Sequence, residues 1–469
     1  MRAGPDVAGP EGPESTIRSM RSAVLSAYRR AMSWAPIEKD TFLYLCATVF
    51  AVATAAVAVS ADYREWGQMA AVAYGIGTVV CAAVAVGSRR GALPASSVGL
   101  ARRLVVAGVI VGAVVVPLVC ELIWRAEARP GANAQSEVAV VERAGDRLAN
   151  GKSPYLDHPV TVGVSPRSDA KSIDANSFYP YLPGMAPFGL ANAAAMPAEL
   201  TDARVTLAGF TLVVAAIALL SASATVGRRG RALQFLVLLP SGALPMVTGG
   251  DDLPVLALML AGLVLVAKRR PVPAGLVLGC AATLKFTAWP VIVLLLLAVR
   301  DRDDRPAPLR FAAAVALVAV PVIGVGFVTS PGAFVENVIR FPLGLTSVKS
   351  PAASPLLGQV LVTTFPDHRR LVTAVLVVIG LALVAYGLRR WTPRTPAAVV
   401  RFTAWAMLLA TLLAPATRFG YLMYPANLFV WAYLLEGMVP APPAAAGLDH
   451  SLAPSPAVLA GGVAPVAPG

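Results

Sequence analysis

The chain has 469 residues, of which 57% are hydrophobic and only 14% charged, and its mean hydropathy is +0.68. Soluble globular proteins carry about 25% charged residues, so this composition excludes a soluble enzyme and a nucleic-acid-binding domain. Continuous apolar runs of about 18 or more residues recur along the chain, and each is long enough to cross a hydrocarbon core about 30 Å thick. The composition therefore predicts an all-α polytopic membrane protein.

The apolar runs, and the charged residues that bound them, predict the membrane-spanning segments. One stretch, residues 271–299, is too long for one crossing and has basic residues at both ends. We therefore expect two short helices that turn near Lys285, which gives about 12 transmembrane helices in all. The other expected spans lie near residues 41–61, 68–87, 104–124, 205–226, 232–248, 252–267, 308–329, 371–388, 402–416 and 421–437.

The formal net charge of +13 reflects membrane topology, because the charges lie between the spans. With this threading, most of the 39 Lys and Arg residues fall in short segments on one side. The positive-inside rule places that side in the cytoplasm, together with both termini, of a protein in the plasma membrane. We expect residues 1–40 to be a largely disordered cytoplasmic segment and residues 438–469 to be a disordered, Ala/Pro-rich cytoplasmic tail.

Two long loops are expected on the extracytoplasmic side, at residues 125–204 and 330–370. Loops of this length within a compact domain are usually functional. In the first loop, residues 178–196 are apolar and rich in Pro and Gly, and we interpret them as an interfacial or re-entrant segment. The second loop predicts a short amphipathic surface helix. Its apolar face would carry Phe334, Val335, Val338 and Ile339, and its polar face Glu336, Asn337 and Arg340.

Cysteine and histidine usage predicts no metal site and no redox pair. The four cysteines lie inside apolar runs and are expected to be small core residues: Cys46, Cys81, Cys120 and Cys280. The histidines are far apart in sequence: His158, His368 and His450. We expect no cofactor, and the sequence leaves a metal requirement open.

Polar residues of both signs are expected on the outer face. Acids populate the first long loop (Glu137, Glu142, Asp146, Asp157, Asp169 and Asp174), and Asp251 and Asp252 lie between two spans. Basic residues at predicted outer ends are Lys285, Arg340, Lys349 and Arg418. Carboxylates close to cations at the lipid headgroup level suit a reaction on a lipid-linked phosphate, with a carboxylate as base and the cations holding the leaving group.

Several short motifs occur in order along the chain. They are Ser136-Glu137-Val138, Asn150-Gly151-Lys152-Ser153-Pro154-Tyr155, Phe178-Tyr179-Pro180-Tyr181-Leu182-Pro183, Gly249-Gly250-Asp251-Asp252, Ala282-Thr283-Leu284-Lys285 and Arg418-Phe419-Gly420-Tyr421. In order and placement they resemble glycosyltransferase family 87 over about residues 104–437. These enzymes have the GT-C fold and use polyprenyl-phosphate sugars. Two additional spans, within residues 41–103, precede this GT-C-like core.

The resemblance implies an inverting glycosyltransferase that moves a sugar, mannose or similar, from a polyprenyl-phosphate donor. The acceptor would be a cell-envelope glycolipid or glycan. Glu137 stands where the family usually has an Asp base, in the long catalytic first loop. The implied phosphate-binding residues are Lys285, Arg418, Arg340 and Lys349, and the implied substrate-binding residues are Tyr155, Tyr179, Tyr181, Asp251 and Asp252.

Each candidate residue also has a structural interpretation. Glu137 fits a solvated loop acid; Glu142 and Asp146 share a predicted helix with Arg143 and Arg147, where local ion pairs are expected. Asp251 and Asp252 could cap the following helix, and Lys285 could extend its charged end to the membrane interface. Arg418 could anchor the chain at that interface, where the three tyrosines could also pack. Two other functions remain open: a secondary transporter, which predicts repeated halves that are not visible here, and an inactive partner in envelope assembly.

Overall fold

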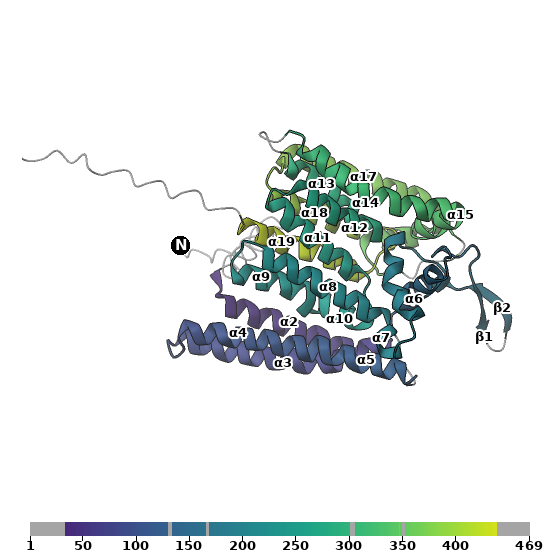
Figure 1. Ribbon diagram of the computed structural model, residues 1–469. Coiled ribbons are helices and arrows are strands. Elements are labelled where there is room, and N and C mark those ends of the chain that lie inside the picture. Colours follow the sequence, from purple (N-terminus) through teal and green to yellow (C-terminus); the bar gives the residue numbers. More distant parts are fainter. Residues whose placement is uncertain are drawn as a thin grey trace, which may run out of the picture.

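The computed structural model describes residues 33–129, 134–165, 168–300, 305–346, 348 and 352–438. Regular structure in these residues is helical except for one antiparallel hairpin, β1 (Thr161–Ser165) and β2 (Ser168–Ile173), which projects from one end of the molecule (Figure 1). The hairpin is not apparent in the sequence pattern. Of the segments expected to be disordered, residues 1–32 and 439–469 lie outside the described residues, as does Lys349, whereas residues 36–40 already belong to the first described helix.

Seven helical segments are long and apolar enough to cross a membrane, so the protein is a polytopic membrane protein. They are α2 (Pro36–Val57), α3 (Ala61–Arg89), α4 to α5 (Ala95–Ile110 and Val116–Ala126, joined by the π-helix η1, Val111–Val115), α8 (Ala203–Ser221), α14 (Ala307–Thr329), α17 (Arg369–Trp391) and α18 (Pro396–Leu413). A bent pair of helices passes the same test only when its two parts are taken together: Val226–Leu238 (α9, Val226–Leu233, with η4, Gln234–Leu238) and α10 (Pro240–Thr248), which meet at a bend of 42°.

The remaining expected crossings correspond to shorter helices. These are α11 (Asp252–Ala267), α12 (Pro271–Leu284), α13 (Trp289–Val299) and α19 (Met423–Glu436). The expected break near Lys285 is present, because α12 ends at Leu284 and the short turn η5 (Phe286–Ala288) precedes α13. The count of 12 crossings stays a prediction, since these helices are too short to qualify by length alone.

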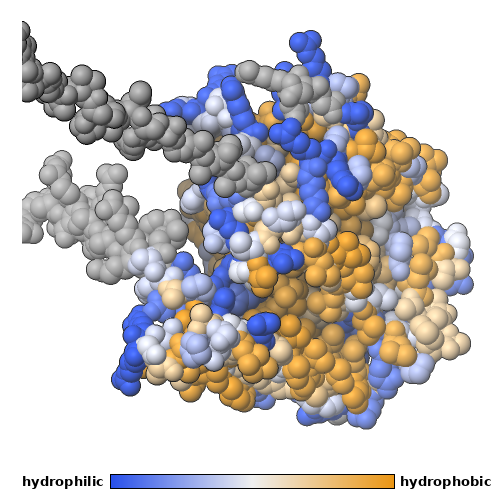
Figure 2. Space-filling model, turned by 60° about the vertical axis from the view of Figure 1, so that its left-hand side comes forward, coloured by the Kyte–Doolittle hydropathy of each residue, from blue (hydrophilic) through white to orange (hydrophobic). Residues whose placement is uncertain are grey.

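The helix bundle has two distinct ends. The first three spanning segments, α2, α3 and α4 to α5, form a layer along one side (Figure 1). The loop elements α6 (Ser136–Ala149), α7 (Ala198–Thr201) and α15 (Pro331–Phe334) gather at one end, and α9 lies toward the other. Much of the outer surface between the ends is hydrophobic (Figure 2), as expected where lipid covers it.

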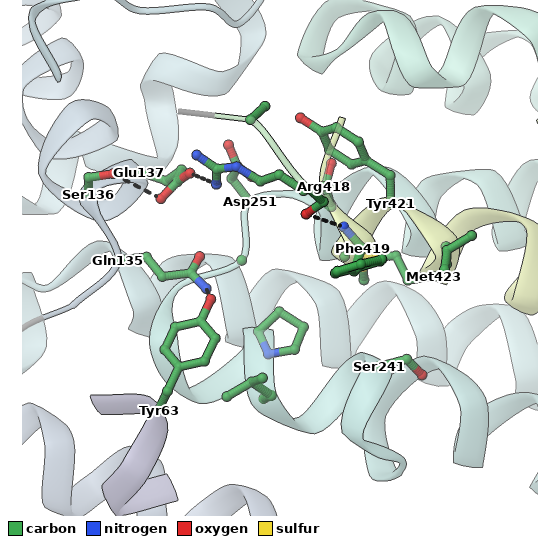
Figure 3. A pocket seen from close by; sticks show the side chains of 18 of the residues that line it. Tyr63, Gln135, Ser136, Glu137, Ser241, Asp251, Arg418, Phe419, Tyr421 and Met423 are labelled. Atoms are coloured by element: carbon green, nitrogen blue, oxygen red, sulfur yellow. Dashed lines mark hydrogen bonds and ion pairs between the residues drawn. The ribbon is translucent and has the colours of Figure 1, made fainter. Parts of the chain in front are cut away.

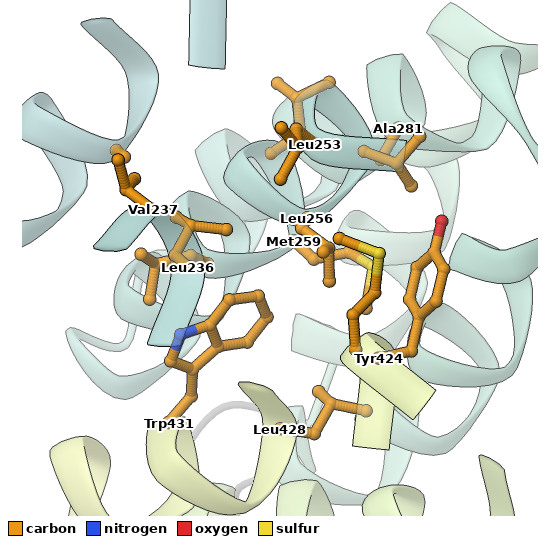
Figure 4. Packing of buried hydrophobic residues seen from close by; sticks show 14 of the residues in the cluster. Leu236, Val237, Leu253, Leu256, Met259, Ala281, Tyr424, Leu428 and Trp431 are labelled. Atoms are coloured by element: carbon orange, nitrogen blue, oxygen red, sulfur yellow. The ribbon is translucent and has the colours of Figure 1, made fainter. Parts of the chain in front are cut away.

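The most buried helix is α11, around which the core is built. Every residue from Leu253 to Leu260 is buried, and Trp431 and Leu428 of α19 pack nearby (Figure 4). Lipid chains are as apolar as these side chains, so close packing rather than transfer from water holds the helices together. The polar start of α11, Asp251 and Asp252, therefore sits at the end of a tightly packed helix.

The first long loop is held to the bundle by α6. This helix packs on the 3-10 segment η3 (Pro183–Ala193) at Gly145 and Gly189, where a Cβ added to Gly145 would lie 2.1 Å from the Gly189 carbonyl carbon. The expected local ion pairs on α6 are wrong. Glu142 instead accepts two hydrogen bonds from Arg125 of α5, at 2.8 and 2.7 Å. Long-range pairing thus fixes α6 relative to the spanning helices.

The second long loop does not form the expected amphipathic surface helix. After α15 the chain continues as a π-helix, η6 (Val335–Arg340), whose wider turn changes which side chains share a face. Asn337, expected on the polar face, is buried and accepts a 2.7 Å hydrogen bond from the Tyr179 backbone N–H. The second loop therefore docks on the first. It continues through α16 (Leu357–Thr364) and η7 (Pro366–His368) to α17.

Candidate active site

A pocket of about 1230 Å³ collects polar side chains from four helix ends. Among the residues that line it are most of the charged candidates: Glu137, Asp251, Asp252, Lys285 and Arg418. Figure 3 shows how Glu137, Arg418 and Asp251 lie close together, with Tyr421 beside them. The pocket brings Glu137 and Arg418 together, although they are 281 positions apart in the chain.

Breaks in the helices place these residues in the pocket. Glu137 lies in the first turn of α6, where the helix dipole favours a negative charge. Gly249 ends α10 with a φ of +111°, a conformation that favours glycine, and turns the chain toward Asp251. Lys285 follows the end of α12, and Arg418 precedes the short 3-10 helix η8 (Phe419–Leu422). The side chains are thus presented by helix ends on a rigid frame.

Glu137 and Arg418 form an ion pair across the pocket. The Arg418 guanidinium donates to Glu137 Oε1, and the Ser136 hydroxyl donates to Glu137 Oε2 at 3.2 Å (Figure 3). The Glu137 side chain is only 15% exposed. Burial acts to lower the pKa of Arg418, but the charge of Glu137 outweighs it and raises that pKa above its ordinary value. Arg418 is therefore a permanent cation beside the candidate base.

Lys285 binds both aspartates. Its Nζ donates to Asp251 Oδ1 and Asp252 Oδ1, each at 2.6 Å, and lies 5.0 Å from the centre of the Tyr181 ring. Tyr424 also donates to Asp252 Oδ1, at 2.6 Å. Burial raises the pKa of Asp251 to about 6, although the Lys285 charge opposes this shift. The buried Lys285 is thus one member of a network, not a snorkelling side chain.

Helix capping does not explain Asp251. This residue occupies the position before α11, yet its side chain makes no capping hydrogen bond to the described residues of that helix. Its Oδ1 instead accepts from Lys285. The geometry favours a role in the electrostatics of the pocket.

The three candidate tyrosines lie together, but only Tyr181 is among the described residues that line the pocket. Tyr155 and Tyr179 are buried edge-to-face neighbours, with ring centroids 5.4 Å apart, and Tyr155 also packs on Phe334 at 5.3 Å. The Tyr155 hydroxyl donates to the Tyr181 backbone oxygen at 3.0 Å. Tyr155 and Tyr179 therefore support the segment that presents Tyr181.

The other two cations predicted to bind phosphate are not brought into the site. Arg340 pairs with Glu336 at 3.1 Å on the surface and is absent from the described lining of the pocket. Lys349 lies outside the described residues. The structure thus assembles two of the four predicted cations, Lys285 and Arg418.

Several pocket residues were not predicted from the sequence. Gln135, which precedes α6, donates through its amide to the Tyr63 hydroxyl (Figure 3). The same amide donates to Thr248 Oγ1 at 3.0 Å. It stands two positions before Glu137, a proximity that could have drawn attention to it. Tyr63 belongs to α3 and has no sequence signal linking it to the site. Together they tie the start of α6 to α3 and α10.

A metal ion would need several acidic, cysteine or histidine side chains in one place. Within the described part of the chain, no group of three or more His, Cys, Asp or Glu side chains is placed to hold a metal ion. The expectation that the protein uses no cofactor stays a prediction.

A multi-span membrane protein with acidic and basic side chains joined in one large pocket at the helix ends fits the class of membrane-embedded enzymes. The family model for glycosyltransferase family 87 matches residues 179–415, about half of the chain, and the chain belongs to this family. It is therefore a membrane glycosyltransferase and not a secondary transporter. No curated protein and no solved structure matches it significantly.

The matched region contains part of the pocket. Tyr181, Asp251, Asp252 and Lys285 lie within it. Glu137 precedes it and Arg418 follows it, so the family match does not cover these two residues, and the structural support for them is their ion pair in the pocket.

Proposed function

We propose that the protein transfers a sugar, mannose or a similar hexose, from a polyprenyl-phosphate donor to a cell-envelope glycolipid or glycan acceptor. The reaction takes place on the extracytoplasmic face of the plasma membrane and inverts the anomeric configuration. One observation carries the proposal. A single pocket holds a carboxylate that can accept a proton and two cations that can hold a leaving phosphate, Arg418 and Lys285.

The reaction is a single displacement. The acceptor hydroxyl oxygen attacks the anomeric carbon, a new glycosidic bond forms, and the bond from that carbon to the phosphate oxygen breaks. Glu137 takes the hydroxyl proton, and the lipid phosphate leaves with the electron pair. One carboxylate is enough, because a phosphate leaving group does not need protonation by a second acid. Attack opposite the leaving group inverts the anomeric carbon.

Arg418 couples the donor to the base. A guanidinium has five N–H donors, and the described contacts of Arg418 use one of them on Glu137. A phosphate bound by the other donors shares the positive charge with Glu137 and so weakens the ion pair. Donor binding thereby frees the carboxylate to accept a proton. Such coupling restricts an active base to the donor-bound enzyme.

Lys285 and the aromatic side chains complete the donor site. Lys285 is oriented by Asp251 and Asp252, so its charge is fixed before the phosphate arrives. Tyr181 and Tyr421 also line the pocket, and an aromatic ring there can stack on a sugar ring.

The distribution of basic residues supports an extracytoplasmic site. Arg228, Arg229 and Arg231 belong to α9, which lies toward the end of the bundle opposite α6 (Figure 1). The positive-inside rule assigns the α9 end to the cytoplasm. The pocket then opens on the outer side, where lipid-linked sugars are used, and both chain termini are cytoplasmic.

The test is sugar transfer by the purified full-length protein in lipid nanodiscs, from a radiolabelled polyprenyl-phosphate sugar to a glycolipid acceptor. Glu137→Gln keeps the shape of the side chain and removes proton acceptance, so turnover should fall by about 10²- to 10⁴-fold. Donor binding, measured by equilibrium dialysis, should not weaken, because the variant no longer has a carboxylate that competes with the phosphate for Arg418. The matched control is Glu127→Gln, an exposed acid that does not line the pocket.

The variant Glu137→Asp tests whether catalysis needs the full length of the Glu137 side chain. It keeps the carboxylate but retracts it by one methylene, and a displacement of about 1 Å can cost about 10²-fold in rate. We expect Glu137→Asp to be slower than the native protein and faster than Glu137→Gln. Native turnover in Glu137→Gln would refute the base assignment. If the native protein transfers no sugar from any polyprenyl-phosphate donor, the proposed donor class is wrong.

A further inference from the structure

The pocket continues from its polar residues into an apolar slot, and α2 forms one wall of this slot. The lining residues of α2 share one helical face, because they are spaced i, i+3, i+4 and i+7: Leu43, Cys46, Ala47 and Phe50. The facing wall comes from the bent span and from α19: Leu239, Leu244, Met423 and Ala426. The slot and the Glu137–Arg418 pair belong to one continuous pocket.

Hydrogen bonds attach the N-terminal helices to the rest of the bundle near both ends of this slot, and the buried Tyr74 hydroxyl of α3 also donates to the Leu238 backbone oxygen at 2.5 Å. Near the start of α2, the Gln234 amide donates to Asp40 at 3.2 Å and to the Tyr44 hydroxyl at 3.1 Å. Near the other end, the Gln135 amide donates to Tyr63 at the start of α3 (Figure 3). Between these attachments the facing span bends by 42° where Pro240 interrupts its backbone hydrogen bonds.

The slot has buried walls on both sides, at Ala47 of α2 and at Leu239, Leu244 and Met423 opposite, but two side chains of α2 remain accessible. Cys46 is exposed and Phe50 is 47% exposed, although both line the pocket. Cys46 is thus not the core residue that the sequence pattern predicted. An apolar slot that stays open beside ion-paired residues suits a hydrocarbon chain attached to an anionic group.

Apolar contact begins directly beside the cation. Phe419 and Leu422, which follow Arg418 in the chain, line the same pocket. A polyprenyl phosphate has its hydrocarbon chain esterified directly to the phosphate, so its first isoprene units would lie here when Arg418 holds the phosphate. In a glycolipid acceptor, sugars separate the reacting hydroxyl from the hydrocarbon. The slot therefore fits the donor lipid.

We infer that the N-terminal helices α2 and α3 form a wall of the binding site for the isoprenoid chain of the donor. This inference rests on the proposed donor class. Both helices precede residues 179–415, the part of the chain that matches the family. The two-helix addition thus contributes to substrate binding in this protein, with α2 supplying the hydrocarbon contacts and Tyr63 of α3 contacting the start of α6.

Photocrosslinking tests the occupant. The full-length protein in nanodiscs is irradiated with a polyprenyl phosphate that carries a diazirine several isoprene units from its phosphate, and the adducts are mapped by mass spectrometry. We expect adducts on the α2 segment containing Leu43 to Phe50, and their loss when unlabelled polyprenyl phosphate competes. Adducts absent from α2, or displaced only by the glycolipid acceptor, would overturn the inference.

A narrowing substitution tests the consequence for catalysis. Cys46→Trp fills the slot, so KM should rise about tenfold or more for a long-chain donor, equivalent to about 1.4 kcal/mol of binding. KM should hardly change for a donor with only one or two isoprene units. The control is Cys280→Trp, because Cys280 of α12 is also exposed but is not among the described residues lining the pocket. Equal KM changes for both donor lengths would contradict the assignment.

The two experiments separate this inference from the proposed function. Crosslinking uses a lipid without sugar, so it reports the slot even if the protein transfers nothing from such donors. Sugar transfer from a polyprenyl-phosphate donor, together with unlabelled α2 and a normal KM in Cys46→Trp, would leave the proposed function intact and refute the role of the N-terminal helices.

Discussion

Replacing Lys285 with Gln should destabilise the protein as well as weaken donor binding. Lys285, Asp251 and Asp252 have side chains only 11%, 5% and 14% exposed, so solvent screens their interaction little. Removing one partner of a buried pair leaves the other charge uncompensated and typically costs about 3–5 kcal/mol. That loss is a large fraction of the roughly 5–15 kcal/mol that stabilises a folded domain. We expect a clear fall in Tm for Lys285→Gln.

The matched variants isolate the electrostatic cause. Lys285→Gln combined with Asp251→Asn removes both a cation and a buried carboxylate, so this double variant should regain a large part of the lost stability. Lys152→Gln removes an exposed lysine from the first long loop and should leave Tm unchanged. Thermal unfolding of the purified proteins in one detergent, followed by intrinsic fluorescence, measures all three. An unchanged Tm in Lys285→Gln would refute the argument that its charge compensates Asp251 and Asp252.

The same variant should show a defined pH dependence. The ordinary pKa of an Asp is 3.8, and that of Asp251 in the folded protein is raised to about 6. Because the pKa is higher in the folded than in the unfolded protein, protonation of Asp251 stabilises the folded state. This contribution to the free energy of unfolding is lost as pH rises through the folded-state pKa. Without Lys285 the charge that opposes the effect of burial is gone, so the pKa of Asp251 rises further. The stability deficit of Lys285→Gln should therefore be larger at pH 8 than at pH 5; a deficit independent of pH would contradict this explanation.

Three further substitutions test the frame around the pocket, each by thermal unfolding. Gly145→Val places side-chain atoms against the backbone of η3 and should cost about 3 kcal/mol and reduce sugar transfer, whereas a native Tm would mean that α6 can move aside. Arg125→Met leaves Glu142 without its cation and removes one from Asp202, so we expect a loss of about 3 kcal/mol; no loss would show that the pairs are dispensable. Tyr424→Phe deletes the hydrogen bond to the Asp252 carboxylate and the one accepted from Thr287, so it should cost about 1.5–3 kcal/mol or more, and equal stability would exclude both bonds.

The sequence predicted the membrane class and much of the threading because both depend on local composition. A run of apolar residues identifies a spanning helix wherever it occurs, and basic residues at both ends of 271–299 were sufficient to predict the break at Lys285. The pairing of charges was not predictable in this way. Glu142 binds Arg125 from another helix instead of the arginines beside it on α6, and this preference depends on how the helices pack.

The candidate site, like the fold, could be predicted only in part from the sequence. Glu137, Lys285 and Arg418 were identified as polar residues where apolar or loop sequence made them conspicuous, and all three line one pocket. Arg340 is also a charged residue in a predicted loop, but it lies on the surface, paired with Glu336. The sequence of a loop does not show whether a charged side chain in it is buried or exposed. Tyr63 could not be found at all, since a tyrosine near the end of a spanning helix is ordinary at a membrane interface.

The pairing of Glu137 with Arg418 has a consequence for biosynthesis. The two residues are separated by 281 positions, and Arg418 is followed only by η8, α19 and the C-terminal segment. Helices enter the membrane in order as the chain is made, so the carboxylate is in place long before its partner is synthesised. The pocket closes only when nearly the whole polypeptide has been inserted. A chain interrupted before α19 would therefore carry most of the spanning helices yet have no assembled site, which ties activity to completion of the protein.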